Sequence, residues 1–262
     1  FLFSMFSPRD AGMEKVIDGS YPNANPVYSD DGKLLFYLDD MNNATDASVL
    51  RVAVLDEGNK TVIDDSGFGD MSISASGSHD NATIAFVRFT NRLETNEPGS
   101  TITLADQTRM MNGSEIFVGK KLNGSGGVEK ITDNFHADLA PTVVTKDDKI
   151  YVAWRESAVN NQDYLSGNKS VDNLVYKYFD GASWSEKKII HNGDNGSLKG
   201  HNIAIMDNGK AAVAFAVDIS EDSSIDQDVY YAVLNKDEIV RYVRANSDSK
   251  YDENPQIASV TY

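Results

Sequence analysis

A four-strand pattern recurs along this chain without exact repetition, and it limits the possible fold more than any other feature. One copy reads APTVVTKDDKIYVAW and then DNLVYKYFDGASWSEKKIIHN; the next reads HNIAIMDNGKAAVAF and then QDVYYAVLNKDEIVRYVRAN. Each copy holds four short alternating apolar segments separated by turn residues, which is typical of β-strands. Self-similarity on this scale indicates a repeat architecture. We therefore predict an all-β fold, a β-propeller of four-stranded blades.

The spacing of the copies supports this interpretation. The residues that close successive units are Asp18, Asp64, Asp133, His191 and Ala245, at intervals of 46, 69, 58 and 54 residues. Propeller blades run to ~40–50 residues before insertions, so the excess is inserted loop. We expect blades at about 20–65, 66–134, 135–192 and 193–246. All of them belong to one domain, 1–262, because β architectures of this length are commonly single domains.

The two ends of the chain read as parts of a further blade. FLFSMFS and MEKVIDGS, within 1–19, are typical of third and fourth strands, and ENPQIASVTY, within 247–262, is typical of a first strand. If these segments meet in one composite blade, the ring closes at five blades; otherwise blades are missing. We expect five to six blades, and a chain that is part of a larger multidomain protein.

The third unit illustrates the expected strands and turns. Its strands are predicted at Pro141–Thr145, Ile150–Arg155, Leu174–Phe179 and Ser185–Ile190. The first two strands of a unit are joined by Asp, Asn and Gly, as in DDG, DD and DNG. Asp and Asn accept local backbone hydrogen bonds and Gly supplies a positive φ, so these sequences predict tight hairpin turns.

Composition excludes several classes of protein. The net charge of −16 argues against nucleic-acid binding, which needs clustered Lys and Arg. No cysteine is present, so disulfides and thiolate metal sites are excluded. No apolar run approaches the ~18 residues of a membrane span. An acidic surface keeps a protein soluble, and we expect a secreted or cell-surface bacterial protein.

The repeated unit resembles known propeller families. Its sequence of Pro, apolar strand, DG or NG turn and apolar strand ending in Trp or Phe is similar to sialidase-like propellers and their non-catalytic relatives in large bacterial surface proteins. YFDGASWS at Tyr178–Ser185 resembles a degenerate Asp-box, although Asp180 and Gly181 are adjacent where a residue normally intervenes. The resemblance implies that Asp180 caps a hairpin and that Trp184 packs between blades. YSDDGKLLFYL at Tyr28–Leu38 resembles the repeat of TolB-like propellers. These motifs imply an architecture and no particular activity.

Four long loops are predicted between the second and third strands of the units. They are Asp39–Ala47, Thr90–Gly113, Ser157–Asp172 and Asp218–Gln227. Propeller topology places all four on one face of the ring. Long loops without regular structure often carry function. We therefore expect this face to recognise a glycan or a protein partner.

The candidate ligand-binding residues lie at or near these loops. They are Arg88, Arg92, Phe135, Arg155, Glu156 and Tyr164. Arg155 and Glu156 end a second strand and lead into the loop that holds Tyr164. Phe135, on a connection between units, offers a ring for stacking on sugars.

A sialidase is one enzymatic alternative. Its chemistry needs three arginines on the substrate carboxylate, a tyrosine nucleophile activated by a glutamate, and an acid or base, because the transition state is oxocarbenium-like. The candidate residues could supply parts of this set. However, three arginines do not fall at equivalent inner positions of separate blades, since Arg51, Arg241 and Arg244 lie on third or fourth strands.

A five-bladed glycosidase is the other enzymatic alternative. It would need three inner carboxylates, for which Asp138, Glu156 and Glu253 are candidates. Asp138 and Glu253 could instead accept backbone amides in the turns that lead into first strands. Three inward carboxylates within ~10 Å around the axis would favour a hydrolase, whereas an axis of Ser, Ala and apolar side chains would favour binding. We expect a non-catalytic binding or scaffolding module, with a glycoside hydrolase as the alternative.

Calcium is the metal that the sequence favours. Asp39, Asp40 and Asp46 crowd one long loop, and Asp218 and Asp222 crowd another. Compact carboxylates can supply the six to eight oxygens that Ca²⁺ takes. Neither loop has EF-hand spacing, and a solvated acidic loop is the alternative. The four histidines form no HxH or HExxH pair, so no zinc site is expected.

Overall fold

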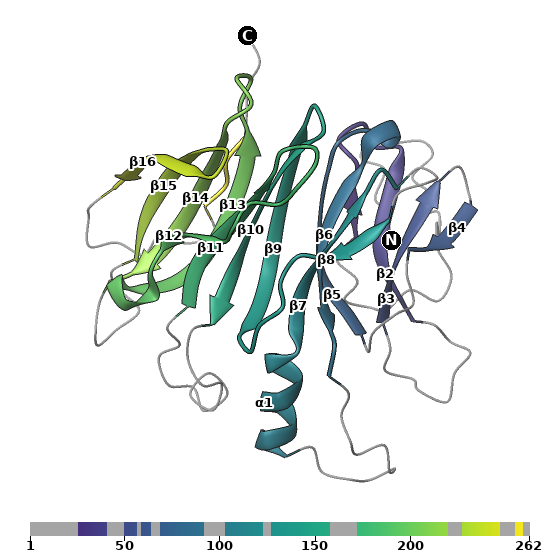
Figure 1. Cartoon of the computed structure of the whole chain (residues 1–262), viewed down its shortest axis with the longest axis horizontal. Coiled ribbons are helices and arrows are strands. Elements are labelled where there is room, and N and C mark those ends of the chain that lie inside the picture. The colour runs from purple at the N-terminus through teal and green to yellow at the C-terminus, as the bar shows by residue number, and fades with distance from the viewer. Residues whose placement is uncertain are drawn as a thin grey trace, which may run out of the picture.

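The fold is a β-propeller made of four-stranded antiparallel blades, as the repeats predicted. The computed structural model describes residues 26–40, 50–56, 59–63, 69–91, 103–122, 127–157, 172–219, 227–246 and 255–258. Each blade consists of four strands that follow one another in the chain, and the blades stand side by side from β1 to β16 (Figure 1). Within these described ranges, no helix has the length and apolar character needed to span a membrane.

The first two blades come from the N-terminal half. Blade 1 contains β1 (Val27–Tyr28), β2 (Leu34–Asp40), β3 (Leu50–Asp56) and β4 (Asn59–Val62). Blade 2 contains β5 (Gly69–Ser76), β6 (Thr83–Phe89), β7 (Ser114–Lys120) and β8 (Val128–Lys130). A 3-10 turn, η1 (His79–Asn81), joins β5 to β6.

The other two blades are longer in their first strands. Blade 3 contains β9 (Ala137–Lys146), β10 (Lys149–Ser157), β11 (Asp172–Phe179) and β12 (Lys188–His191). Blade 4 contains β13 (Ser197–Ile205), β14 (Ala211–Asp218), β15 (Gln227–Asn235) and β16 (Glu238–Arg244). A second 3-10 turn, η2 (Gly193–Asn195), connects them.

The core lies between neighbouring blades. Three clusters of buried side chains fill the three interfaces, and each draws on both blades. They include Phe36 and Phe86 between blades 1 and 2, Ile116 and Trp154 between blades 2 and 3, and Tyr176 and Phe215 between blades 3 and 4. Burying one large apolar side chain contributes about 1.5–3 kcal/mol. Middle strands are buried on both faces, which explains apolar runs such as AAVAFAVD in β14.

A β-bulge interrupts the first strand of blades 2, 3 and 4. In β5 the register shifts between Met71 and Ser74, in β9 Ala140 and Pro141 lie opposite Trp154, and in β13 the extra residue is Lys199. β9 contacts both β5 and β13, so the three bulged strands are neighbours. The bulge also explains why β9 begins at Ala137 and not at the predicted Pro141. A bulge removes the need for a ladder hydrogen bond at the proline.

The hairpin turns have the predicted backbone. Gly32, Asp147, Asp148 and Gly209 all have φ between 51° and 77°. Asp180 accepts hydrogen bonds from the backbone of Ala182 and Ser183, at 2.8 Å each, and so caps its hairpin. Trp184 donates to Glu129 of blade 2 at 2.7 Å. The capping and the contact between blades are those that the Asp-box resemblance implied.

One predicted loop contains a helix. The segment Thr90–Gly113 was expected to lack regular structure, yet α1 (Leu104–Asn112) occupies its second half and projects from the end of blade 2 (Figure 1). Thr103 Oγ1 accepts from Asp106 N at 3.2 Å, and Asp106 Oδ2 accepts from Thr103 N at 3.0 Å. This capping box satisfies two backbone donors and starts the helix.

The first strand that was expected within 247–262 is not present in the part of this segment that the structure describes. Of ENPQIASVTY, the structure describes residues 255–258, which are not in a strand. They lie beside β13, since Asn202 Nδ2 donates to Gln256 Oε1 at 3.1 Å. The strands expected within 1–19 lie outside the described residues.

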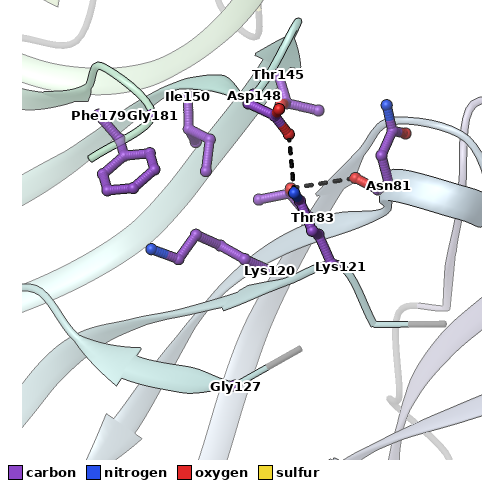
Figure 2. A pocket seen from close by; sticks show the side chains of 10 residues that line it. All are labelled: Asn81, Thr83, Lys120, Lys121, Gly127, Thr145, Asp148, Ile150, Phe179 and Gly181. Carbon is purple, nitrogen blue, oxygen red and sulfur yellow. Dashed lines mark hydrogen bonds and ion pairs between the residues drawn. The ribbon is translucent and has the colours of Figure 1, made fainter. Parts of the chain in front are cut away.

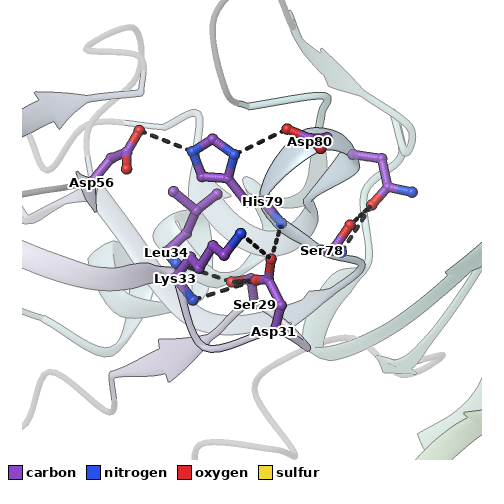
Figure 3. Close-up of polar contacts among 9 residues, drawn as sticks. Ser29, Asp31, Lys33, Leu34, Asp56, Ser78, His79 and Asp80 are labelled. Atoms are coloured by element: carbon purple, nitrogen blue, oxygen red, sulfur yellow. Dashed lines mark hydrogen bonds and ion pairs between the residues drawn. The ribbon is translucent and has the colours of Figure 1, made fainter.

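Polar contacts join blades 1 and 2 at the ends where the hairpin turns lie. Asp31, in the turn after β1, accepts from the backbone of His79 at 3.0 Å. The His79 ring lies between Asp56 and Asp80, at 3.2 and 3.1 Å (Figure 3). This turn face is thus held by charge and hydrogen bonds, whereas the interfaces below it are apolar.

Candidate functional site

A cavity of about 320 Å³ lies where the three bulged strands meet, and we call it the axial cavity. It is lined by Ser72, Ile73, Ala140, Pro141, Thr142, Arg155, Leu198, Lys199, Gly200 and His201. The bulges lie near the starts of the first strands, opposite the ends of the second strands, from which the long loops leave. The axial cavity is therefore close to the face that the sequence singled out.

Two cations of the axial cavity are anchored by aspartates. Arg155 Nη1 lies 3.4 Å from Asp172 Oδ2, and Lys199 Nζ lies 3.3 Å from Asp218 Oδ2. The side chains of Arg155 and Lys199 are 27% and 36% exposed, against 1% and 10% for the aspartates. Neither aspartate lines the cavity. The cavity wall thus presents cations, with the carboxylates behind them.

His201 adds a neutral imidazole. Burial lowers the pKa of His201 to about 4, and hydrogen bonds to the backbone of Ala153 and Ala140 oppose this shift only in part. Nε2 has no hydrogen-bond partner among the described residues, so we assign the backbone contacts, and with them the ring proton, to Nδ1. These backbone hydrogen bonds raise the pKa, so in each of them a ring N–H donates to a backbone carbonyl oxygen. In the neutral ring, the other nitrogen, Nε2, is then an acceptor.

The buried carboxylates of blade 3 lie elsewhere. Asp138 and Glu156 face each other across β9 and β10, and are 0% and 3% exposed. Asp138 accepts from Trp154 Nε1 at 2.7 Å and from Asn134 Nδ2 at 2.9 Å, so its donors are side chains and not the expected backbone amides. Glu156 pairs with Lys187. Neither carboxylate lines the axial cavity.

Burial raises the pKa of Asp138 to about 7, and the neighbouring Glu156 also raises it. The hydrogen bonds from Trp154 and Asn134 act in the opposite direction. Glu115 of β7 extends this network, because its carboxylate accepts from Thr132 Oγ1 at 2.5 Å and from Asn134 N at 3.2 Å. The network fixes the connection from β8 to β9.

Arg88 needs correction as a ligand-binding candidate. Its side chain is 1% exposed, and Nε and Nη2 lie 2.6 and 2.9 Å from the two carboxylate oxygens of Asp70. The guanidinium also lies 5.1 Å from the ring centroids of Phe86 and Phe117. A planar cation held by a bidentate carboxylate and two rings has no face left for a ligand from solvent.

The remaining candidates are scattered. Arg155 lines the axial cavity, and the adjacent Glu156 points into the carboxylate network. Phe135 is 91% exposed on the connection between blades 2 and 3. Arg92 and Tyr164 lie outside the described residues. Among the members of the predicted ligand set that the structure describes, Arg155 lines the axial cavity and the others do not.

The calcium prediction falls mainly on loops that the structure does not describe. Asp46, Asp222 and the side chain of Asp40 are outside the described residues. Asp39 is buried in β2, and Asp218 pairs with Lys199. Within the described ranges, no three acidic or histidine side chains are grouped closely enough to hold a metal ion.

A second cavity, also of about 320 Å³, lies between blades 2 and 3 on the turn face (Figure 2). Its charges are paired: Lys121 Nζ lies 3.3 Å from Asp148 across the interface, and Lys120 Nζ lies 2.5 Å from Glu129 within blade 2. Lys120 Nζ also lies 3.8 Å from the centroid of the Phe179 ring. These contacts join two blades, so we treat this cavity as part of their packing.

Sequence reasoning missed Lys199 as a site residue and considered His201 only as a metal ligand. Signals for their placement were present in the sequence, because Pro141 and Gly200 lie within the observed first strands β9 and β13. Pro and Gly within a strand often mark a bulge. The three bulges converge only when blades 2, 3 and 4 pack side by side, and no local sequence pattern specifies that.

Neither a known family model nor a curated protein sequence matches this chain. Its shape resembles that of an ulvan lyase of polysaccharide lyase family PL25 bound to -[GlcA(1-4)Rha3S]-, with a TM-score of 0.51 and 11% identity over 90% of this chain and 61% of the lyase. A second PL25 ulvan lyase structure gives 0.50 and 10%, over 88% and 59%. The chain thus spans about three fifths of these lyases.

TolB from Acinetobacter baumannii is a more distant match, with a TM-score of 0.46 and 14% identity over 90% of this chain and 46% of TolB. Glycoside hydrolases and lyases are frequent among the similar propellers. At 10–11% identity, the likeness to the two lyase structures shows a shared β-propeller fold alone, because one such fold hosts many activities.

Proposed function

We propose that this chain is a non-catalytic β-propeller module that binds a glycan at the axial cavity, on the face of the long loops. One observation carries the proposal. The described lining of the axial cavity consists of small, apolar and basic residues, and none of these lining residues is a carboxylate. Its small and apolar members are those that the sequence criterion for binding names, and the basic members are additional to that criterion.

The chemistry of glycoside hydrolysis supports the same choice. Most glycosidases need two carboxylates on either side of the scissile bond, about 5–10 Å apart. Asp138 and Glu156 are the described candidates, and both are buried and engaged by Trp154, Asn134 and Lys187. Their contacts hold the connections into β9 and β12, which is a structural task. The glycoside hydrolase remains the alternative that the experiment below would reveal.

The proposal extends to the context of the chain. We place it with the non-catalytic relatives of sialidase-like and TolB-like propellers, as one domain of five to six blades in a larger secreted or cell-surface bacterial protein. A cavity of about 320 Å³ is small for a ligand site, for which ~300–1,000 Å³ is usual. It suits one sugar residue of a glycan, with the long loops available to contact its neighbours.

A glycan array with the purified chain tests this function, together with an assay for sugar release from each bound glycan. We expect binding without release of new sugar ends. Release of sugars would establish the enzymatic alternative, and capture of proteins without any glycan binding would show that the partner is a protein.

A matched pair of variants locates the site. Thr142→Tyr adds a ring to the wall of the axial cavity, whereas Thr145→Tyr makes the same change on the same strand at the turn-face cavity. Both hydroxyls donate to a backbone carbonyl of β10, at 3.3 and 3.1 Å, so the structural cost is similar. Glycan binding should be lost in Thr142→Tyr and kept in Thr145→Tyr. Equal binding by both would place the site elsewhere.

A further inference from the structure

The axial cavity combines basic side chains in a protein that is otherwise strongly acidic. The chain carries a net charge of −16, yet the charged residues that line this cavity are Arg155 and Lys199, from blades 3 and 4. Two cations brought together from separate blades form a local field that attracts an anionic group. Such a field adds little to the binding of a neutral ligand.

The bulges place these side chains. Lys199 is itself the extra residue of the β13 bulge, and Arg155 follows the position at which β10 faces the bulge of β9. Ala140, in that bulge, has a φ of 50°, a left-handed conformation that a residue with a side chain adopts at some cost. Bulges reorient side chains, and here three neighbouring bulges surround one cavity.

Two residues that line the axial cavity each carry a buried polar atom without a hydrogen-bond partner among the described residues. Arg155 Nε has no hydrogen-bond partner among the described residues, and it is a donor. His201 Nε2 is likewise without a partner and is an acceptor in the neutral ring described above. A complementary ligand must therefore bring an anionic acceptor and a hydroxyl donor together. Chloride and sulfate lack the donor, and a neutral sugar lacks the anion.

From this pattern we infer that the axial cavity recognises an acidic sugar, whose carboxylate or sulfate lies against Arg155 and Lys199 while a hydroxyl donates to His201 Nε2. The inference rests on the proposed glycan-binding function and specifies its ligand class. Asp172 and Asp218 hold the two cations in place from behind and partly neutralise them, so the contact provides selectivity more than affinity.

The net charge of the whole molecule further restricts the class of acidic glycan that can bind. A net charge of −16 repels a densely charged polyanion at long range, whereas a single acid group that enters the axial cavity meets the cations at contact distance. The fitting ligand is a glycan in which acidic residues are separated by neutral ones. A fully charged polyuronate should bind less well per acidic residue.

Titration with matched sugars tests the inference. The probes are methyl glucuronide, methyl glucoside and methyl glucoside 6-sulfate, followed by NMR or calorimetry with the complete chain. Charge-assisted hydrogen bonds are the stronger class, and we expect at least about tenfold tighter binding of one or both acidic probes. The carboxylate and sulfate arms show which acid group the cavity prefers.

Variants assign the preference to the cavity. Lys199→Met removes the charge and keeps much of the side-chain length, and Lys188→Met makes the same change at an exposed position of β12. The acidic preference should fall several-fold in Lys199→Met and in Arg155→Gln, and persist in Lys188→Met. Thermal unfolding of each variant shows whether it remains folded.

The outcomes separate the two claims. Equal binding of acidic and neutral probes, or a preference that survives both cavity variants, would overturn the acidic-sugar inference while glycan binding stands. If no probe binds and the array shows no glycan ligand, both the inference and the proposed function fail.

Discussion

Blades 2 and 3 each bury a pair of ionisable side chains at equivalent positions of their first two strands. The two pairs obtain their hydrogen-bond and ion-pair partners in different ways. In blade 2, Asp70 of β5 lies opposite Arg88 of β6; in blade 3, Asp138 of β9 lies opposite Glu156 of β10. Both pairs come just before the bulge of the first strand. One pair is complementary in charge and the other consists of two acids.

The pair in blade 2 is self-sufficient. Arg88 and Asp70 form a bidentate ion pair, and both side chains are almost completely buried. Each charge thus has a partner of opposite sign within the same hairpin. The neighbouring blade therefore does not have to supply a polar partner, and its role at this pair is to exclude water.

The pair in blade 3 depends on residues outside its hairpin. Burial raises the pKa of Asp138 to about 7, and its carboxylate takes donors from Trp154 and from Asn134 on the connection before β9. Glu156 takes Lys187 from the connection before β12. The comparison teaches that the repeat specifies a buried polar pair at this position, and that local partners then determine its chemistry.

Breaking the ion pair of blade 2 should have the largest effect on the free energy of unfolding. Arg88→Met takes the guanidinium away from the buried Asp70 carboxylate, and breaking a buried ion pair in this way costs about 3–5 kcal/mol. Urea unfolding would measure the loss. Removing both charges in Asp70→Leu with Arg88→Met should recover much of it, because no buried charge is left. A single variant as stable as the original protein would show that this pair does not stabilise the blade.

The pH dependence of the unfolding free energy tests the pair in blade 3. The pKa of Asp138 is raised from 3.8 to about 7, so the folded chain holds a proton that the unfolded chain has lost between these values. The contribution of Asp138 therefore makes stability fall as pH rises through this window, by at most about 1.4 kcal/mol per pH unit, and level off above it.

Asp138→Asn should remove this slope, which urea unfolding from about pH 5 to about pH 8 would measure. Asp194→Asn, an exposed acid between blades 3 and 4, is the control and should keep it. A slope unchanged in Asp138→Asn would assign the pH dependence to other carboxylates of the network.

The smallest effect is expected at the surface cluster between blades 1 and 2. Hydrogen bonds that the His79 ring donates to Asp80 and, to a lesser extent, to Asp56 raise its pKa above 6.5 (Figure 3). Stabilisation by the protonated ring is thus fully present below pH 6.5 and is lost as pH rises through the higher folded pKa. Exposed ion pairs contribute little and are screened by salt.

His79→Gln should therefore lower the melting temperature slightly at low pH and low salt, and leave it unchanged at high pH or in high salt. A loss as large as that of Arg88→Met, and independent of pH, would show that His79 acts through packing.

The sequence predicted the regular parts of this protein because their signals are local. Alternating apolar residues and Asp, Asn and Gly turns gave the four blades, and the hairpin cap at Asp180 followed from a resemblance within eight residues. Helix α1 was missed although its capping residues, Thr103 and Asp106, are also local. The whole of Thr90–Gly113 was predicted to be a loop, although the capping box in it is a signal for the start of a helix.

The candidate site was predicted only in part. Arg155 was placed correctly near the end of a second strand, but Arg88, from the corresponding strand of blade 2, is buried against Asp70. Sequence alone cannot separate these cases, because the partner of each arginine comes from another strand. The same holds for Asp138, whose donors come from β10 and from the connection before β9.

By itself, then, the sequence determined the blades, their order and the face that bears the long loops, because periodicity and turn chemistry act over a few residues. Tertiary structure alone decided which charged side chains are exposed and which are buried. Three bulges on neighbouring first strands brought Arg155, Lys199 and His201 to one cavity, and burial set the protonation of His201 and Asp138. Those outcomes depend on contacts between blades that are distant in the chain, and only packing specifies them.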